Sequence, residues 1–189
     1  SVEKKAKYFK EPGSRNTVAL LRAVKKYAVN EGIKHIVIAS TTGKTAVEAV
    51  RILKNLNVVI VAHAFGFKEP GKNEMEEERR QSVVDSGAKI VVGTHALSSA
   101  ERAIRKDFGT IQPLELIANV LRCFGEGTKV CVEITLMAAD AGWIRVDAPC
   151  LSVGGSSEGA DTALLLKPAN AQTFFDLRVL EVLAKPRLG

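Results

Sequence analysis

Hydroxyl side chains, a glycine and a lysine are concentrated in one short stretch, which reads Ser40-Thr41-Thr42-Gly43-Lys44-Thr45. An apolar run precedes this stretch and a helical pattern follows it, so the chain is expected to turn here from a strand into a helix. Unpaired amides at a helix N-terminus, together with the helix dipole, favour an anion. Glycine lets the backbone approach a ligand closely, and hydroxyl groups add donors. The residues predict a phosphate site, and a ligand-free helix cap is the alternative.

The same turn lacks the spacing of a nucleotide-hydrolysing loop. The pattern G-x-x-x-x-G-K-[ST] would need a glycine where Ile38 stands, inside the predicted strand. Residues 66–73 (GFKEPGKN) supply both glycines and the lysine, but Asn73 replaces the magnesium-binding hydroxyl and Pro70 removes a backbone donor. We therefore expect no nucleotide hydrolysis and interpret 66–73 as a surface loop.

Hydrophobic periodicity predicts that helices and strands alternate along most of the chain. Buried strands are expected at 33–40, 57–63, 89–93, 149–155, 160–168 and 179–184. Helices are expected at 15–30, 44–55, 74–86, 98–106, from 113 onward, and at 128–141. This order predicts a three-layer α/β/α sandwich with a mostly parallel sheet, mixed at the edge formed by the last strands. No linker divides residues 1–189, so one domain is expected.

Four predicted strands end in residues that suit contact with a ligand. These exits are residues 40–43, 63–66, 93–95 and 154–157, all rich in glycine, hydroxyl groups or histidine. In open parallel sheets, ligands bind beyond the carboxyl ends of the strands, so we expect the four exits to form one site. The glycines from Gly154 to Gly159 do not have the G-x-G-x-x-G spacing of a dinucleotide-binding fold.

Two histidines, His63 and His95, lie at predicted strand exits. A histidine at such a place can bind a ligand or act as an acid or base, and its alternative is a purely structural role. We favour the structural role for His63 and leave both roles open for His95. Ser98 and Glu101 have the spacing of a capping box and are expected to begin the helix that follows.

Three acidic residues have separate interpretations. Glu133 and Asp140 fall on the predicted 128–141 helix, where a cap, an ion pair or solvent contact is the usual role and a functional role the alternative. Asp161 is expected to hold the glycine-rich turn before it through hydrogen bonds. The spacing of His, Cys, Asp and Glu residues does not suggest a metal site.

Composition narrows the classes of partner. The net charge of +6 favours an anionic partner, but basic residues are mixed with acidic ones and lack the aromatic interleaving typical of nucleic-acid binding, so none is expected. No apolar stretch is long enough to span a membrane, and residues 1–13 lack the apolar core of a signal peptide. Three scattered cysteines suggest reduced thiols and a cytoplasmic location.

Stretches distributed over nearly the whole chain resemble one protein family. The segment "IKHIVIASTTGKTAVEAVRIL" is similar to the opening of the pyruvate kinase C-terminal α/β domain, where such a turn holds the phosphate of a sugar-phosphate effector. "YFKEPG", "GTHALS", "KVCVEITLMAADAG" and "VGGSSEGADTALLLKPA" extend the resemblance to stand-alone, mostly archaeal pyruvate kinase α/β-domain-like proteins. Lys44 departs from that pattern, which can have an acidic residue there.

This resemblance implies a ligand and its placement. Members of the stand-alone family are similar to binders of flavin mononucleotide (FMN), which implies a phosphate on Ser40, Thr42, Gly43 and Thr45 and a flavin along two loops, 94–98 and 154–157. Within those loops the implied contacts are Thr94, His95, Ser98, Gly154, Gly155 and Ser157. No pyruvate kinase activity is implied, because the sequence shows no barrel domain.

Three functions remain open at this level. The first is binding of FMN or another phosphorylated small molecule. The second is a flavin-dependent or phosphosugar-converting enzyme with His95 as the acid or base, and the third is a regulatory module that senses a metabolite. The number of subunits is not indicated, and a homo-oligomer is possible.

Overall fold

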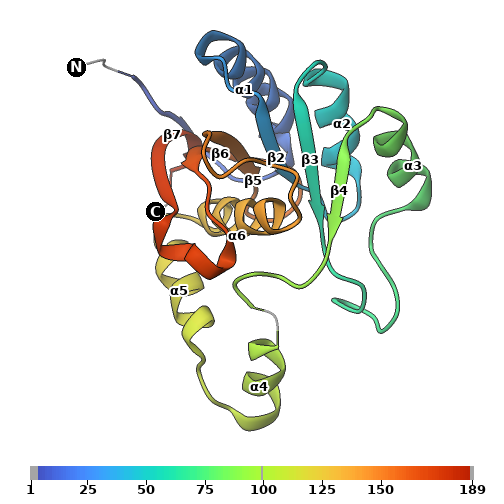
Figure 1. Ribbon diagram of the computed structural model, residues 1–189, viewed down its shortest axis with the longest axis vertical. Helices are drawn as coiled ribbons and strands as arrows, with labels where there is room; N and C mark the ends of the chain where they lie inside the picture. Colours follow the sequence, from blue (N-terminus) through green and yellow to red (C-terminus); the bar gives the residue numbers. More distant parts are fainter. Residues whose placement is uncertain (1–3, 99, 188–189) are drawn as a thin grey trace.

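The computed structural model describes residues 4–98 and 100–187, and its centre is a seven-stranded sheet. The strand order is β1-β7-β6-β5-β2-β3-β4. Neighbouring strands from β5 through β2 and β3 to β4 are parallel, while β6 runs antiparallel to both β5 and β7. This arrangement confirms the prediction of an α/β protein with a mostly parallel sheet that is mixed toward one edge (Figure 1).

The bounds of the elements follow the chain. The strands are β1 (Lys7–Phe9), β2 (His35–Ala39), β3 (Asn57–Ala62), β4 (Lys89–Val92), β5 (Cys150–Gly154), β6 (Thr162–Lys167) and β7 (Arg178–Pro186). The α-helices are α1 (Thr17–Glu31), α2 (Lys44–Ile52), α3 (Glu77–Asp85), α4 (Glu101–Phe108), α5 (Pro113–Arg122) and α6 (Glu126–Asp140). Short 3₁₀ helices occupy Ser14–Asn16 and Ala171–Asp176.

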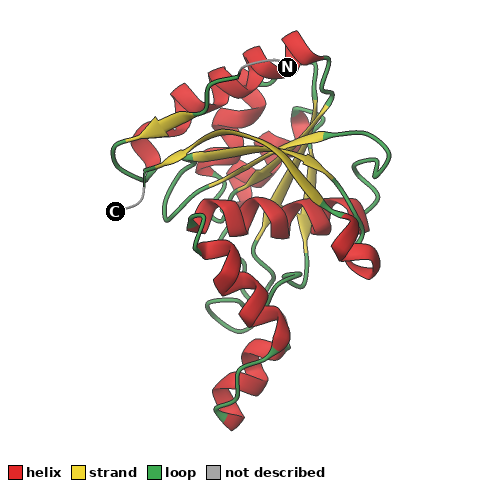
Figure 2. Ribbon diagram, turned by 90° about the vertical axis from the view of Figure 1, so that its left-hand side faces the viewer, coloured by secondary structure: helices red, strands yellow, loops and turns green. Residues whose placement is uncertain are grey.

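Helices cover both faces of the sheet (Figure 2). On one face, α1, α2 and α3 pack with Ile36, Ile38, Ile60 and other strand residues in the larger apolar core. On the other face, α6 packs over the residues of opposite parity, such as Val37 and Val59. Because successive side chains of a strand point to opposite faces, two cores fix the register of each central strand.

The helix α6 is buried around most of its circumference rather than along one face. Twelve of its fifteen residues are buried. The sheet lies on one side, and on the other side Val132 and Leu136 pack with Ala118 of α5 in a third, smaller core. The helix expected at 128–141 begins two residues earlier, at Glu126, and Ala141 after its last residue is exposed.

Three local predictions differ from the structure. The strand β1 was not expected; it pairs in parallel with β7 at the sheet edge, and only Phe9 of its three residues is buried. The helix α3 begins at Glu77 and not at residue 74 as expected. Asn73 Oδ1 accepts a hydrogen bond from the Met75 amide and so holds the preceding residues in a turn. The capping box is wrong: α4 begins after Ala100 without a side-chain cap, and Glu101 accepts the amide of Leu114 instead.

The helices α4 and α5 extend away from the sheet as an arm (Figures 1 and 2). The helix α5 is tied to the body of the protein through its contact with α6. No residue of α4 is buried, and α4 is held to α5 by the Glu101 hydrogen bond and by an ion pair of 3.1 Å between Arg105 and Glu115. Among helices in residues 4–98 and 100–187, none combines the length and apolarity that a membrane crossing requires.

One close approach in the fold requires a glycine. Gly159 lies in the β5–β6 connection with φ +77°, and a Cβ there would lie 2.4 Å from the Cα of Ser14. Gly159→Ala should lower the free energy of unfolding by roughly 2–4 kcal/mol, because it combines a left-handed backbone with overpacking against main chain. Urea unfolding measures this loss.

Gly32→Ala is the matched control for that substitution. Gly32 also has a positive φ of +68°, but nothing lies within 4 Å of the position that a Cβ would take. Its loss should be about 1 kcal/mol, the backbone part alone. Equal losses in the two variants would show that the contact with Ser14 carries no cost.

Candidate functional site

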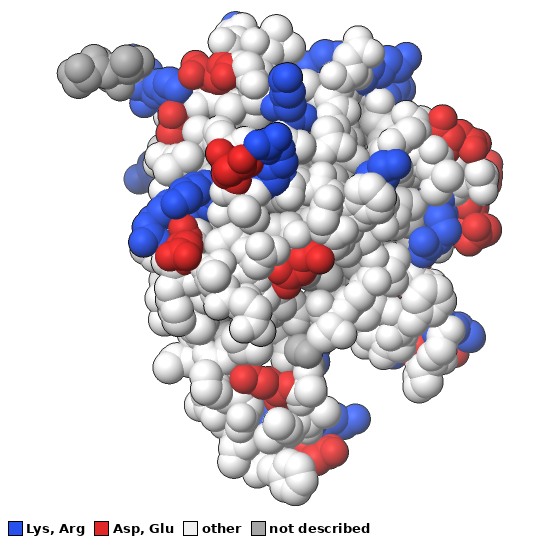
Figure 3. All heavy atoms as spheres, viewed as in Figure 1, with Lys and Arg blue, Asp and Glu red and all other residues white. Residues whose placement is uncertain are grey.

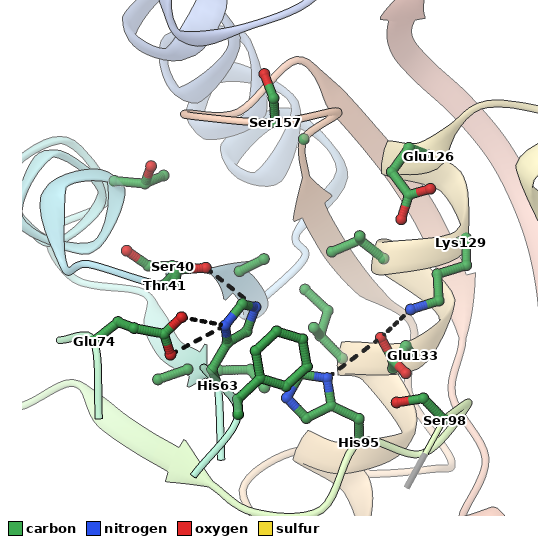
Figure 4. Close-up of a pocket in the computed structure, with 18 of the residues that line it drawn as sticks. Ser40, Thr41, His63, Glu74, His95, Ser98, Glu126, Lys129, Glu133 and Ser157 are labelled. Carbon is green, nitrogen blue, oxygen red and sulfur yellow. Dashed lines mark hydrogen bonds and ion pairs between the residues drawn. The ribbon is translucent and has the colours of Figure 1, made fainter. Parts of the chain in front are cut away.

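A large open cleft lies at the carboxyl edge of the parallel strands. Its volume is about 1610 Å³, and it is lined by the exits of β2, β3, β4 and β5, by the first turn of α2, and by α4, α5 and α6. The space-filling view shows charged side chains of both signs interspersed over a largely uncharged face (Figure 3). The four strand exits expected to form one site therefore do meet in one cavity, which Figure 4 shows in close-up.

The turn between β2 and α2 has free backbone donors, and Lys44 and Thr45, which carry two of them, line this cleft. Ser40 is buried, and its Oγ accepts the Ala46 amide at 3.1 Å, so this residue caps the helix. Among the described residues, no protein group accepts a hydrogen bond from the amides of Gly43, Lys44 or Thr45. The predicted cap and the predicted anion site are thus both compatible with the turn.

The first turn of α2 also differs from that of most other helices. An acidic residue stands in the first turn of α3, α4, α5 and α6, where it compensates the positive end of the helix dipole. The first turn of α2 has none, and neither has that of α1, whose Thr17 also lines the cleft. The N-terminus of α2 is therefore an uncompensated positive end that opens on a cavity.

Gly43 has a role in packing. Its φ is +87°, and a Cβ would lie 2.8 Å from the Cβ of Arg79 and 3.3 Å from the Cγ of Met75. Arg79 also donates to the carbonyl oxygen of Thr42 at 3.1 Å. Gly43 thus allows the turn to pack against α3. The side of the turn that faces α3 is therefore unavailable to a ligand.

The structure places most of the predicted contact residues around the cleft. The residues that line it are Ser40, Thr41, Thr42, Lys44, Thr45, His95, Ser98, Gly155 and Ser157. Gly43, Thr94 and Gly154 are not among the lining residues. Thr94 is exposed outside the cleft, and Gly154 is buried where a Cβ would lie 2.8 Å from the Gly127 carbonyl oxygen of α6.

Asp161 holds the glycine-rich exit of β5, as its position in the sequence predicts. The side chain is fully buried. Its Oδ2 accepts the amides of Ser156 at 3.2 Å and Gly13 at 2.9 Å, and its Oδ1 accepts the Thr162 hydroxyl at 2.8 Å. One carboxylate therefore joins the cleft loop to the segment that leads into α1.

A buried charged network lies on the α6 side of the cleft. Lys129 Nζ is 2.5 Å from Glu133 Oε2, and both side chains are less than a tenth exposed. Glu133 Oε1 accepts the Leu97 amide at 3.0 Å. The carboxylate thus satisfies a backbone donor in the loop after β4 as well as the lysine, so Glu133 is a structural element of the site wall.

His95 belongs to the same network and faces protein with both ring nitrogens. Its Nε2 accepts the Ala64 amide at 3.4 Å, which puts the proton on Nδ1, 4.0 Å from Glu133 Oε2. Burial lowers the pKa of His95; Glu133 opposes this shift, while the charges of Lys129 and Arg102 add to it. His95 is therefore a neutral, partly buried histidine at neutral pH.

His63 makes a different set of contacts, which run across the cleft floor (Figure 4). Its Nδ1 lies 3.1 Å from Glu74 Oε1, and its Nε2 lies 3.3 Å from Thr41 Oγ1. A carboxylate accepts only, so Nδ1 carries the proton and Nε2 accepts the hydroxyl of Thr41. Glu74, His63 and Thr41 therefore form a continuous hydrogen-bonded chain.

The aromatic ring of Phe67 fixes both histidines. It packs at 4.0 Å from the His63 ring and stacks on His95 at 4.9 Å with an interplanar angle of 14°. The guanidinium of Arg102 lies over the same ring, 4.7 Å from its centroid. The 66–73 loop, expected to be a plain surface loop, thus contributes to the cleft through Phe67.

Several residues of the site were missed from the sequence: Phe67, Glu74, Arg102 and Lys129. The spacing of Lys129 and Glu133 at i and i+4 on a helix was a usable signal for their pair. No comparable sequence pattern indicated Glu74, because this residue lies eleven positions from His63 in an irregular segment. Asp140 was considered and lies elsewhere, since it accepts hydrogen bonds from Asn170 and the Ala171 amide.

Other kinds of chemistry have less support in the part of the chain that the structure describes. No group of three or more His, Cys, Asp or Glu side chains there could hold a metal ion. Cys131 and Cys150 are buried away from the cleft, and burial raises the pKa of both thiols, that of Cys150 to about 12. His35, at the opposite end of β2, lies 2.7 Å from Asn57 Nδ2.

No model of a known protein family matches the chain.

The pKa of His95 predicts a pH dependence of stability. Because the folded pKa is below the ordinary 6.5, the unfolded chain binds a proton more readily. The contribution of His95 to the free energy of unfolding should therefore be complete above about pH 7. This contribution should decrease as the pH drops through 6.5 toward the lower pKa of the folded state. Urea unfolding at several pH values should show a smaller fall in His95→Gln, and an unchanged slope would contradict this. The pKa of His35, also lowered by burial, leaves a residual slope.

The buried ion pair predicts an asymmetric response to substitution. Lys129→Met should lower the free energy of unfolding by about 3 kcal/mol, because the Glu133 carboxylate remains buried without its cation. The double variant Lys129→Met/Glu133→Gln should recover much of this loss, since a neutral amide oxygen can still accept the Leu97 amide.

Arg122→Met is the matched control, because Arg122 forms a 2.6 Å pair with Glu126 but both side chains are more than a third exposed. Its effect should be within about 0.5 kcal/mol. Chemical denaturation measures all three variants. A loss at Lys129 no larger than the loss at Arg122 would contradict the role of burial.

Proposed function

We propose that the protein binds a phosphorylated small molecule in the cleft, with the phosphate at the turn of residues 40–45 and FMN as the candidate ligand. The observation that carries this proposal is the N-terminus of α2. Three of its amides donate to no protein group in the described residues, its first turn lacks an acid, and it opens on a cavity of about 1610 Å³. A phosphate dianion would satisfy these amides and the helix dipole together.

Side chains around the turn support the same placement. Thr41, Thr42 and Thr45 line the cleft, and Lys44 is exposed at the first position of α2. Ser40 supports the turn by capping the helix, so it is expected to act on the phosphate indirectly. The whole cleft carries both signs of charge, so the attraction for a phosphate is expected to be local to this turn.

FMN is preferred within the class of phosphorylated ligands for two reasons. The sequence resembles stand-alone pyruvate kinase α/β-domain-like proteins, whose fold class agrees with the mostly parallel sheet. The cleft also continues from the turn past Ser157 on one side and Ser98 on the other, so it has room for a ring system beyond the phosphate. We propose that the flavin lies between these two loops.

A phosphate-binding role does not require His95 as an acid or base. Both nitrogens of His95 face protein groups, and its ring is covered by Phe67. We therefore propose that His95 shapes the wall of the flavin site and supports the loop after β4.

The phosphate placement is tested with Thr42→Asp. This variant puts a carboxylate at the mouth of the turn, where it also favours the helix dipole, so folding should be retained. FMN affinity, measured by quenching of flavin fluorescence, should fall at least about tenfold, which corresponds to about 1.4 kcal/mol. Gly43→Asp is less suitable, because any Cβ there meets Arg79.

Thr110→Asp makes the same chemical change at an exposed residue that does not line the cleft. It should bind FMN like the unaltered protein. Equal affinities for Thr42→Asp and Thr110→Asp would refute the phosphate placement, and no binding of FMN by the unaltered protein would refute the ligand.

A further inference from the structure

We propose that Thr41 is a nucleophile activated by His63 and Glu74, and that the cleft hydrolyses carboxylic esters. The motivating observation is the continuous chain from Glu74 through His63 to Thr41, with distances of 3.1 Å and 3.3 Å. A hydroxyl, an imidazole and an orienting carboxylate in this order constitute the arrangement that activates a weak nucleophile. This proposal goes beyond ligand binding and does not require a phosphate at the turn.

The fold fixes the contact between Thr41 and His63. β2 and β3 are parallel with Ala39 opposite Val61, and the Ser40 amide extends the pairing by donating to the Val61 carbonyl oxygen. Two residues further along, Thr41 and His63 leave the same sheet edge side by side. Their contact therefore follows from the strand register and the two cores that determine it.

The orienting carboxylate is also held in place. Asn73 Nδ2 donates to the His63 carbonyl oxygen at 2.7 Å, and Asn73 Oδ1 accepts the Met75 amide at 2.9 Å. These bonds hold the residues on either side of Glu74 and keep its carboxylate at Nδ1 of the imidazole. Phe67 packs on the ring and limits its rotation. The imidazole is thus held in the tautomer that accepts a proton at Nε2.

The position of the nucleophile decides between acyl and phosphoryl chemistry. In an in-line phosphoryl displacement, the leaving group departs on the side opposite the nucleophile, where the His63 imidazole cannot reach it. In acyl transfer, one imidazole removes the proton from the nucleophile and gives it to the leaving group of the same tetrahedral carbon. His95 offers no second acid, because its nitrogens are engaged by Ala64 and face Glu133. A single relay, formed by Glu74, His63 and Thr41, therefore fits the hydrolysis of an ester.

The turn after Thr41 supplies the groups that such a reaction needs. The oxyanion of a tetrahedral intermediate develops one full charge, which preorganised amides stabilise. The free amides of Gly43, Lys44 and Thr45 lie in the turn that follows the nucleophile, at the positive end of α2. An oxyanion and a free phosphate would compete for them.

The proposed reaction balances with water as the only co-reactant. The Thr41 Oγ1 proton moves to His63 Nε2 while the oxygen forms a bond to the acyl carbon, and the carbonyl electron pair moves to its oxygen. The intermediate collapses, the bond to the alkoxy oxygen breaks, and that oxygen takes the proton from His63 as the alcohol leaves. Water then gives a proton to His63, attacks the acyl-threonine, and Thr41 recovers its proton as the carboxylic acid leaves.

The test uses a fluorophosphonate probe on the intact chain, followed by mass spectrometry of the peptides. Thr41 Oγ1 should displace fluoride from phosphorus and gain the mass of the phosphonyl group, while the proton leaves with fluoride. Thr41→Val, which keeps the shape without the hydroxyl, should abolish labelling, and Thr41→Ser should retain it. His63→Gln should slow labelling at least about a hundredfold, as expected for a general base.

Hydrolysis of p-nitrophenyl acetate provides the second measurement, and release of p-nitrophenolate should follow the same order among the variants. Thr110→Val makes the same substitution at an exposed threonine outside the cleft and should leave both rates unchanged. The proposal is overturned if the probe does not label Thr41, if it labels another residue at the same rate, or if His63→Gln labels as fast as the unaltered protein.

Inorganic phosphate separates this proposal from the one above. If phosphate binds the turn, it should slow labelling of Thr41 in a concentration-dependent way. Labelling that phosphate does not affect would leave the relay intact and overturn the phosphate placement. Phosphate binding without labelling would overturn the relay alone.

Discussion

The common direction of β5, β2, β3 and β4 is the constraint on which the cleft depends. Each of these strands has apolar side chains in both cores, so a slip of one residue would exchange the two sets and disrupt their packing against both helix layers. The carboxyl ends of the strands are therefore fixed relative to one another. Thr41 and His63 are brought together by the packing of the two cores around the strands that precede them. No attraction between the two side chains is needed for this contact.

Buried polar side chains then hold the loops that leave this edge. Ser40 satisfies an amide of α2, Asp161 satisfies amides on two segments, and Glu133 satisfies the Leu97 amide together with Lys129. Each acceptor lies where solvent cannot replace it, so losing the contact would leave an orphaned donor as well as a displaced loop. Stability and the shape of the cleft are in this way properties of the same hydrogen bonds.

The sequence predicted the elements that have long, periodic apolar patterns and the strand exits that follow from them. It did not predict β1, because a three-residue strand with one buried side chain has no measurable period. The role of Asp161 was foreseen because its partner Ser156 is close in sequence, whereas the Glu74–His63 contact depends on the path of an irregular loop. Ser98 and Glu101 had the spacing of a cap, but a partner on another helix, Leu114, competes for Glu101. Local patterns were therefore reliable where the core enforced them and failed where distant groups offered a better hydrogen bond.

The arm of α4 and α5 gives the two walls of the cleft unequal tolerance to change. The wall formed by the strand exits is continuous with the two main cores, so a new side chain there disturbs the sheet. The opposite wall includes Arg102, Arg105 and Glu115, and α4 has no buried residue at all. Substitutions or insertions in the arm can accordingly alter which molecules fit without unfolding the sheet, so ligand selectivity is able to diverge among descendants of this chain while the reactive edge keeps its geometry.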